Sequence, residues 1–168
     1  MIGDIKIKMP KTEEGVKNYF QSCEKRKKFV GDIAEHYKNR LKKAKHDLQC
    51  AVDESKNENW DWTIIKSYYA IHHAGNALLS KKKQQFSKDH SCLVIALKHH
   101  NLISQNFLDE LISITENFSD TLSIDLAFEM RKIGQYDVDK WEELTEDDAN
   151  KVLEFAKKFI SYVEGEIK

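Results

Sequence analysis

Residues 61–80 read DWTIIKSYYAIHHAGNALLS, and this stretch decides the fold of the chain. Apolar side chains occur on every face of a helix drawn through it, and its alanines line up as a strip of small residues. A helix that is apolar all round must be enclosed by other helices. We therefore predict a central helix over residues 61–80, with Tyr68 and Tyr69 mostly in the core.

Further helices are predicted on both sides of this stretch, because the chain has only one proline and six glycines to interrupt them. The architecture that follows is an all-α, up-and-down bundle of four to five helices with an extra N-terminal helix. We divide it into an N-terminal arm and helix, residues 1–30, and a helical bundle, residues 31–168. The apolar spacing places the other helices at residues 12–30, 32–55, 88–100, 104–133 and 145–163.

Side chains that can accept hydrogen bonds from a first helical turn predict where these helices begin. Gly31 is expected to end the first helix, and the segment NFSD at residues 117–120 can interrupt the helix over 104–133. The predicted caps are Asp32 with Glu35, Ser87, Ser104, and Thr145 with Asp148.

Composition and charge exclude some classes of protein. No stretch approaches the roughly 18 apolar residues of a membrane span, and the start MIGDIKIKMPK lacks the apolar run of a signal peptide. We therefore expect a cytoplasmic protein without membrane contact. The net charge is −1, with basic residues concentrated before residue 100 and acidic ones after it. A basic face could meet phosphate, although a solvated surface is the plainer interpretation.

The cysteines and histidines do not predict a metal centre or a cofactor. Cys23, Cys50 and Cys92 are odd in number and far apart, so free thiols are expected rather than a disulfide framework. The pairs 72–73 and 99–100 are adjacent histidines, which point to different faces of a helix. His46 and Cys50 share a face but are too few to hold a metal.

One group of residues could contact an anionic ligand. The segment MRKIGQYDV places Arg131 just before a glycine, with Tyr136 five positions later. An arginine at a helix end with an aromatic ring nearby is suited to phosphate. The alternative, which residue chemistry alone favours, is that Arg131 pairs with an acidic residue of the C-terminal half and Tyr136 packs.

The order of these pieces resembles the HEPN family of small helical-bundle domains over residues 41–164. The stretch LKKAKHDLQCA resembles the A-x-x-D-L helix of the family, and 61–79 is similar to its Y-Y-A-x-x-H-A-A-x-A-L-L helix, with Gly75 in place of an alanine. The segment SKDHS at 87–91 matches the next element and puts His90 on the histidine of the family. The segment RKIGQYDV resembles the R-x-x-A-x-Y element.

The resemblance implies a homodimeric bundle in a family tied to RNA cleavage, to toxin–antitoxin pairs with nucleotidyltransferase partners, and to nucleotide binding. Active ribonucleases of the family carry an arginine, four to six residues and then a histidine, and they need no metal. Here Arg131 is present, but Tyr136 occupies the position at which that histidine is expected, and a tyrosine with a pKa of about 10 is a poor base. His73 and His90 are the candidate replacement bases, and Tyr69 is a further candidate ligand contact.

Three functions remain open from the sequence. The first is a non-catalytic or weakly catalytic module that binds RNA, a nucleotide or a partner protein near Arg131 and Tyr136. The second is a metal-independent endoribonuclease, the toxin of a toxin–antitoxin pair. The third is an interaction scaffold in which Arg131 forms only a salt bridge.

Overall fold

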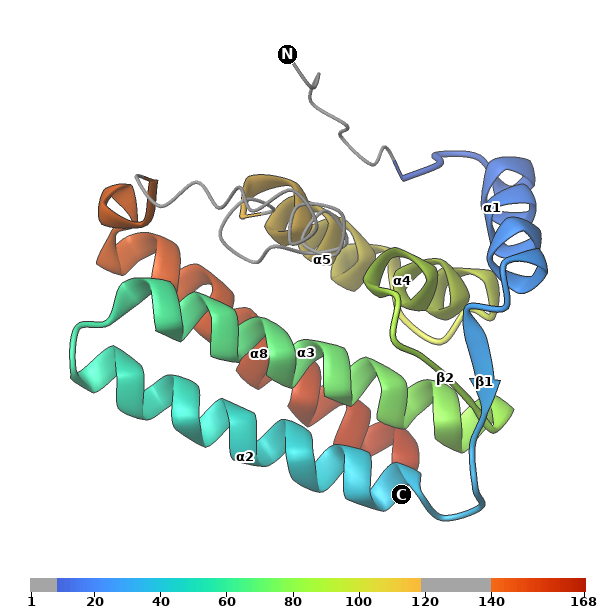
Figure 1. Cartoon of the computed structure of the whole chain (residues 1–168), viewed down its shortest axis with the longest axis horizontal. Helices are drawn as coiled ribbons and strands as arrows, with labels where there is room; N and C mark the ends of the chain where they lie inside the picture. Colours follow the sequence, from blue (N-terminus) through green and yellow to red (C-terminus); the bar gives the residue numbers. More distant parts are fainter. Residues whose placement is uncertain (1–8, 119–139) are drawn as a thin grey trace.

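The computed structural model describes residues 9–118 and 140–168, and over these residues the fold is all-α, as predicted. Three long helices, α2 (Tyr37–Lys56), α3 (Trp60–Lys83) and α8 (Glu146–Ile167), pack side by side (Figure 1). The shorter helices α4 (His90–His99) and α5 (Gln105–Asn117) lie along the other side of α3 and α8. The N-terminal helix α1 (Glu13–Lys25) packs on α4.

Helix α3 is the central helix that the sequence predicts. It packs against α2, α4 and α8, and most of its 24 residues are buried. Gly75 lies under α4, where an added Cβ would come within 3.2 Å of a side-chain carbon of Leu93. The apolar faces predicted for the last helix and for α4 are also confirmed, and both turn toward this core. In the described part of the chain, no helix is both long enough and apolar enough to cross a membrane.

Two of the predicted caps are confirmed. The hydroxyl of Ser104 accepts a hydrogen bond from the backbone N–H of Phe107 at 3.2 Å and begins α5. Thr145 and Asp148 form a complete capping box at the start of α8. In both places the cap needs only residues of its own first turn, so local spacing was sufficient to predict it.

The predicted cap at Asp32 is wrong, and α2 begins five residues later, at Tyr37. Asp32 accepts hydrogen bonds from Arg40 Nε at 2.7 Å and from the ring of His36 at 2.8 Å. Burial would raise the pKa of Asp32, but hydrogen bonds from Arg40, Ser80 and His36 hold it well below its usual value. The carboxylate is therefore engaged by side chains of α2 and α3 and does not cap.

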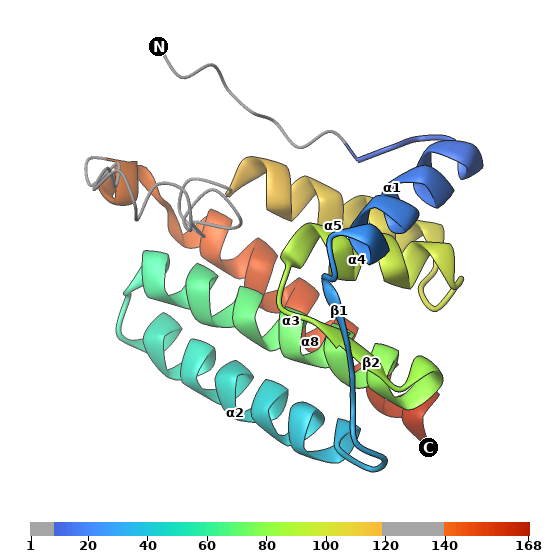
Figure 2. The ribbon, with the colours of Figure 1, turned by 45° about the vertical axis from the view of Figure 1, so that its right-hand side comes forward.

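The cap predicted at Ser87 is also wrong, because Asp89 caps α4 by accepting from the N–H of Cys92 at 3.0 Å. Ser87 instead lies in a strand that the sequence did not predict. Strand β2 (Gln85–Ser87) pairs antiparallel with β1 (Phe29–Gly31), and the two are seen together in Figure 2. The first helix thus ends at Lys25 rather than near residue 30, and Gly31 belongs to a strand.

A disulfide joins Cys23 of α1 to Cys92 of α4, which corrects the expectation of free thiols for these two residues. Their Cα atoms are 5.9 Å apart although 69 positions separate them in the chain. Only the packing of α1 on α4 brings them together, and spacing in the sequence cannot reveal that contact. Cys50 is a free cysteine, as expected.

Asn76 attaches the strand pair to the central helix. Its side chain is 2% exposed, donates to the carbonyl of Ser87 at 2.8 Å and accepts from the N–H of Ser87 at 2.8 Å. A buried backbone group that loses its partner costs about 1–3 kcal/mol. Both backbone groups of Ser87 depend on this one side chain.

We expect Asn76→Ala to lower the free energy of unfolding by about 2–4 kcal/mol, because it leaves a buried N–H and C=O of Ser87 without partners. Urea denaturation followed by circular dichroism measures this. Gln49→Ala, at an exposed position of α2, is the matched control and should change stability by less than about 0.5 kcal/mol. Equal effects of the two substitutions would contradict the proposed role of Asn76.

Candidate functional site

The central helix reaches solvent along one row of side chains, Trp62, Lys66, Tyr69 and His73, spaced as one helical face. Trp62 is 51% exposed and Tyr69 44% exposed, which is unusual on a helix otherwise enclosed. The prediction that Tyr69 lies in the core is therefore wrong, whereas Tyr68, at 4% exposed, is in the core as expected. We call these four residues the open row.

Charges of the open row are matched by side chains of α2. Lys66 forms an ion pair with Glu54, and the hydrogen bond between them raises the pKa of Lys66 and lowers that of Glu54. The ammonium group of Lys66 also lies 5.9 Å from the centre of the Trp62 ring. Because Lys66 is already paired, the open row offers aromatic rings rather than a free positive charge.

At the far end of the open row, His73 faces a carboxylate. Its Nε2 atom is 3.6 Å from Oδ2 of the buried Asp47, close enough for attraction but longer than a direct hydrogen bond. The other oxygen of Asp47 is held by Lys43. Burial lowers the pKa of His73 and outweighs the opposite effect of Asp47, and the positive charges of Lys43 and Arg40 lower it further.

This arrangement gives His73 a defined chemical capacity. The lowered pKa keeps the imidazole neutral at pH 7. A proton on Nε2, facing Asp47, leaves Nδ1 with the lone pair that can accept a proton. His73 therefore has the protonation state that a general base requires.

A second set of rings lies on the inner side of His73. The centre of the His72 ring is 4.2 Å from that of His90 and 5.8 Å from that of His73. Nδ1 of His90 is 3.2 Å from the hydroxyl of Tyr68, and Nε2 of His72 is 3.2 Å from the amide nitrogen of Asn76. We call His72, His73 and His90 the histidine cluster. It joins α3 to the first residue of α4.

His72 has a more strongly lowered pKa than His73. Burial holds its pKa well below the usual value, and the neighbouring His90 and His73 act in the same direction. Its buried Nδ1 atom has no hydrogen-bond partner among the described residues. His72 lines a small cavity together with Tyr68, His90 and Gly75. The neighbouring rings therefore oppose protonation of both His72 and His73.

The structure brings together only some of the residues singled out in the sequence. His73 and His90 belong to one cluster through His72, and Tyr69 lies on the adjoining open row. Arg131 and Tyr136 lie outside the described residues, as does the part of the predicted 104–133 helix from residue 119 onward. Whether either histidine lies near Arg131 stays a prediction.

Sequence reasoning missed Asp47, Trp62 and His72 as parts of the site. Two local signals marked Asp47, its place as the aspartate of the A-x-x-D-L element and its spacing of four residues from Lys43, but neither indicates that it faces a histidine. No three or more histidine, cysteine, aspartate or glutamate side chains come together as a possible metal site within residues 9–118 and 140–168.

Comparison with known proteins agrees with the helical fold. The sequence model of the HEPN domain matches residues 37–166, which includes the whole of α2, α3, α4 and α5 and nearly all of α8. No match was found among the curated proteins. Helix α1 and strand β1 precede the matched region.

We expect stability to fall as the solution is acidified below pH 6.5. His72, His73 and His100 all have lowered pKa values in the folded chain, mainly through burial, whereas unfolded histidines titrate near 6.5. Below that pH the unfolded chain binds more protons, so acid favours it. Each histidine that stays neutral in the folded chain lowers the free energy of unfolding by up to about 1.4 kcal/mol for every pH unit below 6.5.

Urea denaturation between pH 8 and pH 5 tests this, with His72→Gln beside the exposed His46→Gln. The loss of stability with acid should be shallower in His72→Gln and unchanged in His46→Gln. Identical pH dependence in all three proteins would show that His72 is not held neutral by the fold.

Proposed function

Because this chain belongs to the HEPN domain family, we propose that it is a helical module that binds RNA or a nucleotide and has little or no cleavage activity. In this proposal Arg131 contacts phosphate, and Tyr136 and Tyr69 contact a base or sugar. A homodimer is part of the proposal, in keeping with the family. The proposed protein partner is a nucleotidyltransferase-like protein, because toxin–antitoxin pairs of the family contain one.

The observation that carries the binding function is the open row. Trp62 and Tyr69 are exposed on the same face of α3 and seven residues apart, which is about 10 Å along a helix. Exposed aromatic rings stack on nucleic-acid bases regardless of sequence, at about 1–3 kcal/mol per base. Lys66 is paired with Glu54, so we assign the phosphate contact to Arg131, because a guanidinium is suited to it.

Low cleavage activity follows from the chemistry of position 136. Transfer of the 2′-hydroxyl proton at neutral pH requires a group whose pKa lies near 7. A tyrosine hydroxyl, with an ordinary pKa of about 10, can form hydrogen bonds, but it is almost entirely protonated at neutral pH and so is a poor general base. Tyr136 therefore suits a ligand contact better than it suits catalysis.

The pair formed by Asp47 and His73 favours a second candidate, a metal-independent endoribonuclease that acts as a toxin. A neutral imidazole beside a buried carboxylate is the arrangement expected of a general base. In this alternative Arg131 stabilises the phosphate and His73 replaces the histidine that Tyr136 displaces. A protein-interaction scaffold is the third possibility, in which neither RNA nor a nucleotide is bound.

We expect Tyr69→Ala and Arg131→Ala each to weaken binding of a labelled single-stranded RNA by about 5- to 100-fold, because one loses a stacked base and the other a phosphate contact. Fluorescence anisotropy at fixed salt measures the affinity. Ile33→Ala, which removes a side chain that is 77% exposed and distant in sequence from the open row, is the control. Wild-type affinity in both test variants, or no binding by the wild type, would favour the scaffold.

We expect the wild type to leave RNA intact in EDTA and Tyr136→His to gain cleavage, because it restores the spacing of arginine, four residues and histidine. The double variant Arg131→Ala/Tyr136→His should lose that activity. Cleavage by the wild type would instead support the second candidate. It should then fall at least 100-fold in His73→Ala and remain in His46→Ala.

A further inference from the structure

Helix α1 and strand β1 lie before the region that matches the HEPN domain, and they are fastened to it chiefly at α4. The apolar part of this attachment centres on Phe20, whose ring stacks on His99 at a centroid distance of 4.1 Å and tilts against Phe29 at 5.1 Å. The covalent part is the disulfide between Cys23 and Cys92. We call residues 13–31 the N-terminal clamp.

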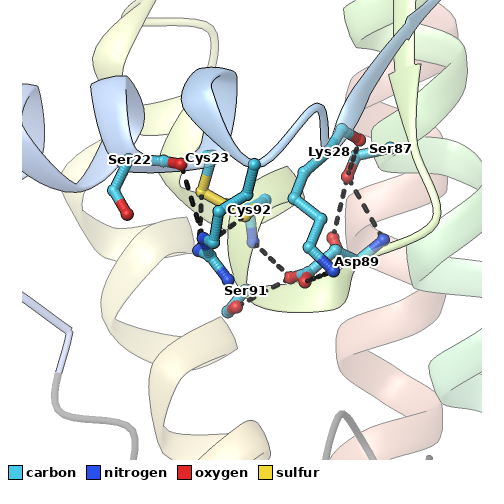
Figure 3. A network of polar contacts seen from close by, with 8 residues as sticks. Ser22, Cys23, Lys28, Ser87, Asp89, Ser91 and Cys92 are labelled. Carbon is cyan, nitrogen blue, oxygen red and sulfur yellow. Dashed lines mark hydrogen bonds and ion pairs between the residues drawn. A yellow bond between two sulfur atoms is a disulfide. The ribbon is translucent and has the colours of Figure 1, made fainter.

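The clamp meets α4 at its first turn, as Figure 3 shows. Asp89, which caps α4, accepts from the hydroxyl of Ser91 and pairs with Lys28 of the clamp at 3.4 Å. The hydroxyl of Ser87 donates to the carbonyl of Lys28 at 3.0 Å. His90 follows Asp89 directly and carries a ring of the histidine cluster, so the clamp holds the same turn that positions His90.

The disulfide lies in surroundings that favour thiol chemistry. Both cysteines are fully buried, and Nη2 of Arg26 lies 3.6 Å from each sulfur. Arg26 itself is exposed, so its guanidinium reaches the two sulfurs from the surface of the protein. A guanidinium beside a sulfur stabilises the thiolate and so assists both departure and return of that sulfur in exchange reactions. Cys92 is also in the first turn of α4, where the helix dipole favours a negative charge.

We propose that Cys23 and Cys92 form a thiol–disulfide switch that locks the clamp onto α4 when oxidised and releases α1 when reduced. A thiolate of a dithiol reductant attacks one sulfur, forms a mixed disulfide and displaces the other as a thiolate near Arg26. The second thiol of the reductant then completes its own disulfide. Two electrons and two protons pass to the protein, which ends with two thiols. The proposal holds whether or not the chain binds RNA.

Release of α1 has a direct consequence for the site. Once α1 is released, α4 loses the cover of Phe20, and Lys28, which closely follows α1, is held less firmly against Asp89. The first turn of α4, including His90, then becomes freer to move. Reduction is therefore expected to loosen the histidine cluster at its α4 side, while the packing of α3 against α2 and α8 is retained.

Hydrogen–deuterium exchange of the full chain, before and after treatment with dithiothreitol, tests the switch. We expect the amides of α1 to exchange at least 10-fold faster in the reduced protein and those of α8 to be unchanged. Cys50→Ser, which keeps the disulfide and removes the remaining thiol, should behave like the wild type in both states. Cys23→Ser/Cys92→Ser should match the reduced protein without treatment.

Three outcomes would overturn the proposal. Equal protection of α1 in both states would mean that noncovalent contacts alone hold the clamp. Loss of protection in α8 together with α1 would mean that the bond supports the whole bundle. A disulfide that is not reduced by excess dithiothreitol in the folded protein would be purely structural and not a switch. As an independent measurement, Arg26→Gln should slow reduction at least 3-fold, and an unchanged rate would remove the role assigned to the guanidinium.

Discussion

The structure depends on the burial of α3 on all but one of its faces. Three neighbours, α2, α4 and α8, enclose a helix whose buried positions are mainly alanine, leucine, isoleucine and other small or apolar residues, and no other element among the described residues packs so broadly. Small side chains at Ala70, Ala74 and Ala77 permit this close approach, and each is fully buried. Because the neighbours are arranged around α3, the few side chains that it leaves open to solvent are conspicuous, and these form the open row.

The same constraint explains the unusual state of the histidines. His72 and His73 occupy positions of α3 that are partly enclosed, so burial opposes their protonation, and His90 is brought against them by the docking of α4. Polar side chains at the edge of a tightly packed helix must find partners nearby. Asn76 meets this demand through the backbone of Ser87, and Asp47 partly meets it through Lys43. The polar residues of the site thus lie where α3 is no longer fully covered by apolar side chains of its neighbours.

Features that depend on residues close together in the sequence could be predicted, whereas features that depend on contacts between distant segments could not. The central helix and the caps at Ser104 and Thr145 depend on spacing within a few turns, and they were predicted correctly. Asp32 satisfies the same local rule but is held by Arg40, and the disulfide and the strand pair need contacts between distant segments. At the site, His73 and His90 were recognisable from residue type and family resemblance. Asp47 also lies in a family motif, but its contact with His73, and the place of His72 between His73 and His90, become visible only once α2, α3 and α4 are assembled.

The disulfide also sets the route by which the chain would carry mechanical load. A pulling force applied at the N-terminus passes from α1 through the two sulfurs into α4, and it bypasses the 69-position stretch of chain between them. That stretch contains α2 and α3, which are therefore shielded from tension while the bond is closed. Opening the bond would add about 230–250 Å of extensible chain, at roughly 3.3–3.6 Å per residue, and would place the central helix in the path of the force.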